Sequence, residues 1–148
     1  RFQYLLVRLF LRKHPYFPSL LDQSFLEQSN IYLFDSDLFP EIMDYLSYFD
    51  KLITDYSSIY LDFLCLDRPM AFIPYDIEQY TKYTGFTIPY EEFTPGKHIS
   101  NKEEFYNFIT NKDDEYSIAR AEITKLVNAK PSGNCEENYQ FIQELLKK

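Results

Sequence analysis

The sequence predicts an α/β fold with a parallel sheet, chiefly from the stretch between Lys51 and Asp76. Two short apolar runs, Lys51 to Thr54 and Met70 to Ile73, have the length and composition of buried parallel strands. Between them, apolar residues recur at a spacing that suits a helix packed on a sheet, namely Ile59, Leu61, Phe63, Leu64 and Leu66. This order of strand, helix and strand predicts one βαβ unit.

Two further strands are expected before this unit. Tyr4 to Leu11 has the β-branched and aromatic content of a strand, although its leucines would also suit a short helix. Ile31 to Phe34 is the second, and a helix is expected over Pro40 to Phe49, with Pro40 near its first turn. We expect all four strands to lie parallel in one sheet.

The second half of the chain is predicted to be mainly helical. Gly85 to Gly96 contains two prolines and is interpreted as a long loop, a mobile flap over a ligand. Ser100 and Glu103 have the spacing of a capping box at a helix start. Three helices are expected, over Asn101 to Thr110, Asp113 to Asn128 and Glu136 to Lys148.

The polar break Asp55 to Ser58 is the first candidate site. Ser57 and Ser58 fall at the expected helix start, beyond the carboxyl end of a strand, where open α/β sheets place their ligands. Free N–H groups and the helix dipole favour phosphate there. Asp62 lies one turn further on the same face, so it can accept hydrogen bonds from hydroxyls of a phosphorylated ligand. The alternative is an ordinary N-cap followed by a solvated Asp62.

A second candidate cluster, Arg12-Lys13-His14, ends the first expected strand, and Pro15 stops that element. Two fixed cations and a histidine, whose charge changes near neutral pH, would suit a diphosphate at a strand's C-terminal end. The alternative is a basic surface loop.

With these motifs the chain resembles the C-terminal half of the CDP-glycerol glycerophosphotransferase family, whose members build teichoic-acid and capsule-type polyol-phosphate polymers. The resemblance rests on Arg12 to Pro15, Leu52 to Pro69, Pro74 to Tyr80, Gly85-Phe86, Tyr90-Glu91 and Pro95-Gly96. The chain departs from the family's usual pattern at Thr84 and Pro89. It also departs in the tail from Ser132 to Asn138, where only Gly133 is retained as a candidate ligand contact.

The resemblance implies a Rossmann-like three-layer domain, the C-terminal half of a GT-B fold, with residues 1–148 as a single domain. It implies that the opposing N-terminal acceptor half, with its own histidine as general base, lies outside this chain. The start at Arg1 likewise indicates a piece of a longer protein. We therefore expect a donor-binding part that is inactive in turnover by itself.

The implied reaction is attack of a polyol-phosphate acceptor's hydroxyl on the distal phosphorus of CDP-glycerol or CDP-ribitol, which releases CMP. Six residues match family positions that contact the donor: Arg12, Lys13, His14, Ser57, Ser58 and Asp62. The serines and helix-start amides would hold the diphosphate, and the basic cluster, with His14 as the catalytic candidate, would neutralise charge on the leaving CMP. Asp62 would orient donor hydroxyls. No metal or other cofactor is expected.

Composition excludes other partners. The formal net charge is −8 and the basic residues are scattered, which argues against nucleic acid and against an anionic membrane surface. No apolar stretch has the length of a membrane span, and Cys65 and Cys135 show neither metal nor redox spacing. The expected location is the cytoplasm, with attachment to the inner face of the membrane only through parts outside this chain.

Two other interpretations stay open. A nucleotide-sugar glycosyltransferase half would use the same fold and phosphate site, with Glu78 as the candidate for sugar hydroxyls. A non-catalytic domain that assembles a capsule-synthesis complex would explain the altered tail at Glu136 and Asn138.

Overall fold

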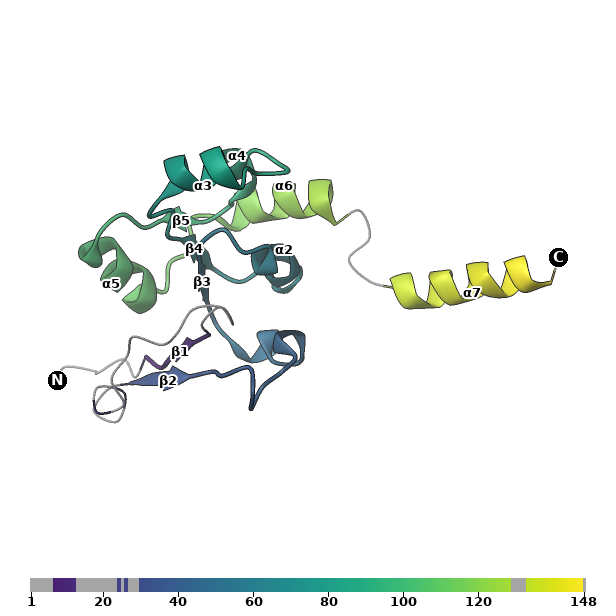
Figure 1. Cartoon of the computed structure of the whole chain (residues 1–148), viewed down its shortest axis with the longest axis horizontal. Coiled ribbons are helices and arrows are strands. Elements are labelled where there is room, and N and C mark those ends of the chain that lie inside the picture. The colour runs from purple at the N-terminus through teal and green to yellow at the C-terminus, as the bar shows by residue number, and fades with distance from the viewer. Residues whose placement is uncertain (1–6, 13–23, 25, 27–29, 129–132, 148) are drawn as a thin grey trace. The chain divides into compact units, whose positions relative to one another are not determined.

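The computed structural model describes residues 7–12, 24, 26, 30–128 and 133–147, and it combines parallel strands with helices (Figure 1). Its strands are β1 (Leu9–Leu11), β2 (Ile31–Leu33), β3 (Leu52–Thr54), β4 (Met70–Phe72) and β5 (Lys97–His98). Its α-helices are α2 (Ile59–Phe63), α3 (Ile77–Tyr83), α4 (Tyr90–Phe93), α5 (Lys102–Thr110), α6 (Ser117–Val127) and α7 (Asn134–Leu146). The chain divides into two compact units, residues 1–50 with 101–112 and residues 51–100 with 113–148.

In the first unit, β1 and β2 pair in parallel, with Leu9 opposite Ile31. Phe34, directly after β2, is 6% exposed and lies at the centre of six packed rings. These rings, here called the first aromatic cluster, belong to Phe10, Tyr32, Phe34, Phe39, Tyr45 and Phe49. The cluster is the packed centre of this unit.

The prediction of a helix over Pro40 to Phe49 is wrong. The segment instead forms two 3₁₀ turns, η1 (Ile42–Asp44) and η2 (Leu46–Tyr48), whose backbone bonds span three residues. The apolar spacing predicted the packed face correctly, because the rings of Tyr45 and Phe49 both meet Phe34. Two tight turns achieve that packing, so tertiary contacts override the local helical pattern.

The cap of α5 differs by one residue from the expected Ser100 and Glu103 box. Asn101 is the N-cap, and its side chain accepts a hydrogen bond of 2.9 Å from the N–H of Glu104. Asparagine is among the strongest N-cap residues, so the helix begins at Lys102.

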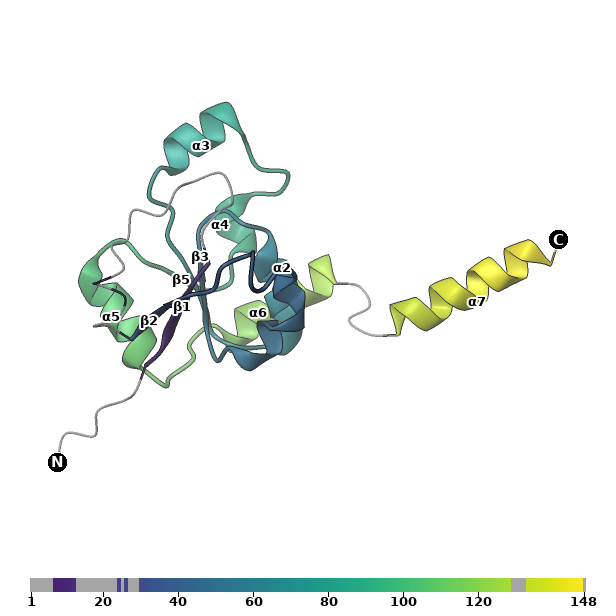
Figure 2. The same cartoon turned by 60° about the horizontal axis from the view of Figure 1, so that its bottom comes forward.

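The second unit contains the predicted βαβ unit. β3 and β4 pair in parallel, with Leu52 opposite Met70, and α2 followed by the 3₁₀ turn η3 (Leu64–Leu66) joins them. β4 lies between β3 and β5 (Figure 1), and all three of its residues are buried. Helix α6 runs beside α2 in both views (Figure 1, Figure 2) and contacts η3, and the Asn128 side chain donates to the Leu61 carbonyl at 3.3 Å.

The prediction that four strands share a single sheet is wrong, because β1 and β2 form one ladder while β3, β4 and β5 form another. Hydrophobic patterning predicts that a strand exists, but the choice of its neighbour depends on contacts distant in sequence.

The prediction of one long loop over Gly85 to Gly96 is wrong in part, while its interpretation as a mobile flap stays a prediction. This segment contains α4, and its last three residues, Thr94 to Gly96, are buried before β5. A Cβ atom at Gly96 would lie 2.3 Å from the Met70 carbonyl oxygen. Glycine is therefore required there for the backbone to approach β4 closely.

Candidate functional site

The Asp55–Ser58 loop lies between the end of β3 at Thr54 and the start of α2 at Ile59, as predicted. Asp55 Oδ1 accepts a 3.2 Å hydrogen bond from the N–H of Ser57, and Ser57 Oγ accepts one of 3.4 Å from the N–H of Ile59. Ser58 is the N-cap residue, yet its side chain makes no capping hydrogen bond. Both serines are exposed. The Ser58 hydroxyl therefore does not cap α2, although an ordinary N-cap was the alternative interpretation of this serine.

Asp62 is exposed and lies in the first turn of α2, four residues after Ser58. That spacing places the two side chains on the same helix face. Because α2 has only five residues, its dipole is short, and local hydroxyl and amide groups are the main donors that this loop offers an anion. The site is therefore a small polar surface with two carboxylates, Asp55 within the loop and Asp62 beside it.

Arg12 has a structural role in the first unit. Its Nη1 donates to the Phe39 carbonyl at 2.7 Å and its Nη2 to the Pro40 carbonyl at 3.1 Å. The guanidinium also lies 5.9 Å from the centre of the Phe34 ring. Two of its five N–H donors are therefore committed to the fold. Lys13 and His14 lie outside the described residues, so their predicted convergence with Ser57 stays a prediction.

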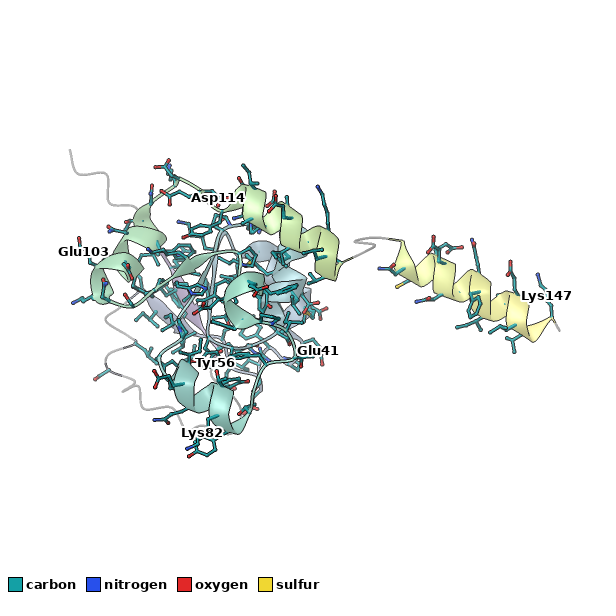
Figure 3. The ribbon with its side chains drawn as sticks, turned by 90° about the horizontal axis from the view of Figure 1, so that it is seen from above. Glu41, Tyr56, Lys82, Glu103, Asp114 and Lys147 are labelled. Carbon is teal, nitrogen blue, oxygen red and sulfur yellow. The ribbon has the colours of Figure 1, made fainter. Side chains whose placement is uncertain are left out.

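A second aromatic cluster, which the sequence interpretation did not assign to the site, lies against the loop. It consists of the rings of Tyr56, Tyr75, Tyr80, Phe86 and Tyr90. Tyr56 lies beside α3 (Figure 3), and its ring stacks on that of Tyr80 with 4.1 Å between centroids. Tyr90 is 8% exposed and stacks on Phe86 at 4.9 Å. One feature of the sequence could have indicated this cluster, namely Tyr56 within the Asp55–Ser58 block.

Two hydroxyls of this cluster bond to backbone groups. Tyr90 Oη donates to the Asp55 carbonyl at 3.0 Å, and Tyr56 Oη accepts from the N–H of Asp76 at 3.1 Å. Burial is the main cause that raises the pKa of Tyr56 to about 12, and the nearby Asp76 carboxylate adds to it. Burial also raises the pKa of Tyr90. Both phenols therefore stay protonated at physiological pH.

His98 connects to the same cluster through Thr94. The Thr94 hydroxyl donates its one proton to the Tyr90 carbonyl at 2.7 Å, so the 2.8 Å contact with His98 Nε2 is one in which the imidazole donates. Burial is the main cause that lowers the pKa of His98, and it outweighs the opposing effect of Glu91. His98 is thus held in its neutral form near neutral pH.

An ion cluster around the buried Arg120 secures α6 in the same unit. Arg120 is 1% exposed and binds both carboxylate oxygens of Asp114, one of them at 2.7 Å. It also contacts Asp67 Oδ1 at 3.0 to 3.1 Å. The Arg120 hydrogen bonds lower the pKa of Asp114. Since a buried arginine without a carboxylate would be strongly unfavourable, this cluster is structural.

Other candidates add little to the site. Glu78 is exposed on α3, where it lines an open hollow with Gln79, Lys82 and Tyr83. Within the described part of the chain, no three His, Cys, Asp or Glu side chains are grouped to hold a metal ion. No described helix has the length and apolar character needed to cross a membrane.

Parallel strands joined by helices, with an exposed polar loop after β3, define an α/β domain. Residues 6–142 match the family model described as CDP-Glycerol:Poly(glycerophosphate) glycerophosphotransferase, and the chain belongs to this family of transferases. The family predicted from the sequence is therefore confirmed.

Relatives and a solved structure agree with this assignment. Over 104 residues the chain is 32% identical to the teichoic acid ribitol-phosphate polymerase TarL of Staphylococcus aureus, covering 70% of this chain and 18% of that protein. It is 30% identical over 139 residues to a teichoic acid glycerol-phosphate primase of Bacillus subtilis, covering 93% and 35%. The structure of the wall teichoic acid polymerase TagF matches with a TM-score of 0.65 and 27% identity, covering 95% of this chain and 34% of that one.

The likeness to TagF confirms the predicted fold class, α/β with GT-B-type architecture. The chain spans only 18% to 35% of the length of these three proteins.

Proposed function

We propose that this chain is the donor-binding domain of a transferase that moves a polyol phosphate from a CDP-activated donor to a growing polyol-phosphate polymer. Family membership supports the transferase class, and the relatives named for ribitol- and glycerol-phosphate polymers support CDP-ribitol or CDP-glycerol as the donor. The observation that carries the proposal is the Asp55–Ser58 loop, where an exposed Ser58 hydroxyl lies at a helix start without a capping bond.

In the proposed reaction an acceptor hydroxyl forms an O–P bond to the distal phosphorus of the donor, and the bond from that phosphorus to the bridging oxygen breaks. CMP leaves with that oxygen, and the hydroxyl proton passes to a base supplied outside this chain. Ser57, Ser58 and nearby amides hold the diphosphate through charge-assisted hydrogen bonds. Asp62 accepts hydrogen bonds from the donor's polyol hydroxyls.

The basic segment has the complementary role in this proposal. His14 and Lys13 neutralise charge that develops on the leaving CMP. Arg12 contributes mainly its positive charge, because two of its N–H groups already bind the Phe39 and Pro40 carbonyls. No metal or other cofactor has a role.

The acceptor and the general base belong to an N-terminal half outside this chain, so the 148 residues alone bind the donor without turnover. The coverage of the relatives supports this division, since the chain corresponds to about a third or less of each. We place the protein in the cytoplasm, at the inner face of the membrane only through parts outside this chain.

The test is CMP release by the full-length protein from the complete coding frame, with the 148-residue chain as the matched control. We expect CMP from CDP-glycerol or CDP-ribitol when a polyol-phosphate acceptor is present, and none from the isolated chain. Turnover of a nucleotide sugar instead would establish the glycosyltransferase interpretation. A folded full-length protein that turns over neither donor class would favour a non-catalytic assembly role.

A further inference from the structure

Two tyrosine hydroxyls attach the Asp55–Ser58 loop to helices distant in the sequence. Tyr90, in α4, lies 35 residues after Asp55 and donates to its carbonyl at 3.0 Å. Asp76, the N-cap of α3, lies 20 residues after Tyr56 and donates its N–H to the Tyr56 hydroxyl at 3.1 Å. Two consecutive loop residues are therefore fixed from outside the loop, immediately before the two serines.

The rings around these hydroxyls restrict where each can lie. Tyr56 stacks on Tyr80 with an interplanar angle of 29°, and Tyr90 stacks on Phe86 at the same angle. Tyr56 and Tyr90 also meet edge to face, with centroids 5.5 Å apart. Because each ring packs on a neighbour, its hydroxyl is presented to the backbone in a defined place.

The loop's own hydrogen bonds are weaker constraints. The two local bonds, from Ser57 N–H to Asp55 and from Ile59 N–H to Ser57, are 3.2 and 3.4 Å long and exposed. Both lengths lie at or beyond the upper end of the usual range for N–H to oxygen contacts. Water competes at such exposed groups, so the tyrosine bonds contribute most to the position of the loop.

We propose that Tyr90 and Tyr56 are positioning residues of the donor site, holding the Ser57 and Ser58 hydroxyls where the diphosphate binds. This inference rests on the proposed function. The Tyr90 hydroxyl donates to the Asp55 carbonyl and the Tyr56 hydroxyl accepts from the Asp76 N–H, so both act on the position of the backbone. The raised pKa values keep both phenols protonated, so Tyr90 remains a donor at physiological pH.

The test compares hydroxyl deletions in the full-length protein. Tyr90→Phe keeps the ring but removes the bond to the Asp55 carbonyl, and we expect the KM for the CDP-polyol donor to rise about fivefold, the equivalent of one hydrogen bond, with a smaller change in kcat. Tyr56→Phe removes the acceptor for the Asp76 N–H and should shift KM in the same direction. It also keeps the proposal testable if Tyr90→Phe does not fold.

Tyr60→Phe is the matched control. Tyr60 is 6% exposed and packs on Phe72, and within the described residues no hydrogen bond joins its hydroxyl to the loop. This variant should keep the parental KM. If Tyr90→Phe and Tyr56→Phe lower only the thermal unfolding temperature and also keep the parental KM, the tyrosines are merely structural and the inference is wrong.

A double-variant cycle with Ser58→Ala separates the two proposals. If Tyr90 acts through the loop, the effect of Tyr90→Phe on KM should shrink in the Ser58→Ala background, whereas an equal factor in both backgrounds overturns the inference. A raised KM in Ser58→Ala beside a parental KM in Tyr90→Phe overturns the inference alone. A parental KM in Ser58→Ala overturns the donor site and this inference with it.

Discussion

The two aromatic clusters use similar ring packing for different purposes. In the first cluster, the rings of Phe10, Phe39, Tyr45 and Phe49 surround Phe34, and the adjoining cation is Arg12. In the second cluster, tyrosines predominate, and two of their hydroxyls bond to backbone groups at the Asp55–Ser58 loop and at Asp76. The first cluster buries Phe34 beneath partly exposed rings. The second adds polar contacts that fix an exposed loop, which is where the candidate site lies.

The largest expected effect is in the first cluster. Phe34→Ala removes the central ring, which is 6% exposed, and should lower the free energy of unfolding by ~3–5 kcal/mol through lost burial and the cavity left behind. Chemical denaturation measures this loss. Leu38→Ala, at a side chain that is 75% exposed in the same unit, should change stability by less than about 0.5 kcal/mol. Similar losses in the two variants would mean that Phe34 is not the centre of a core.

A smaller effect distinguishes the hydroxyls of the two clusters. Tyr90→Phe should lower the free energy of unfolding by about 1 kcal/mol, because the Asp55 carbonyl loses its buried partner. Tyr45→Phe should be nearly neutral, since among the described residues no hydrogen bond joins its hydroxyl to the backbone. Parallel denaturation of both variants checks this, and equal losses would remove the distinction between the clusters.

The smallest expected effect is a pH dependence at His98, which is linked to the second cluster through Thr94. Burial lowers the pKa of His98 below its ordinary value of 6.5, so the unfolded chain takes up this proton at a higher pH than the folded protein. As far as His98 is concerned, the free energy of unfolding is therefore at its full value above pH 6.5 and declines as the pH falls below 6.5.

In denaturation measured between neutral pH and pH 5, His98→Gln should weaken this decline. Asp114 does not interfere with this measurement. Its pKa is lowered in the folded protein, so its contribution to the free energy of unfolding is lost only when the pH falls below 3.8, the ordinary pKa of the group. An unchanged pH dependence in the variant would show that His98 titrates alike in both states.

Local patterns in the sequence predicted part of this structure. The βαβ unit and the position of Ser57 and Ser58 at a helix start follow from short-range periodicity and turn chemistry, and both are confirmed. The sequence motif around Asp55 to Ser58 also indicated the correct family.

Features that depend on distant contacts were missed. β5 was not predicted and the buried segment before it was interpreted as a loop, because the need for Gly96 appears only when β4 lies against it. The hydrogen bonds of Arg12 to backbone carbonyls were not predicted, because those carbonyls are 27 and 28 residues away. The bond from Tyr90 to Asp55 spans 35 residues, and no local pattern encodes it. The contacts of the second aromatic cluster with the loop therefore became visible only in the fold.

The central claim is that the loop held by the second cluster binds the donor's diphosphate. Calorimetric titration of CDP-glycerol into the full-length protein tests it, with Ser117→Ala, at another exposed helix start, as the control. Ser58→Ala should weaken binding by about tenfold or more, because one charge-assisted hydrogen bond is worth roughly 1.5–3 kcal/mol, while the backbone amides retain some affinity. Ser117→Ala should bind as the parent does. If Ser58→Ala and Asp62→Ala both bind CDP-glycerol as tightly as the parent, the loop is an ordinary helix cap and the donor site lies elsewhere.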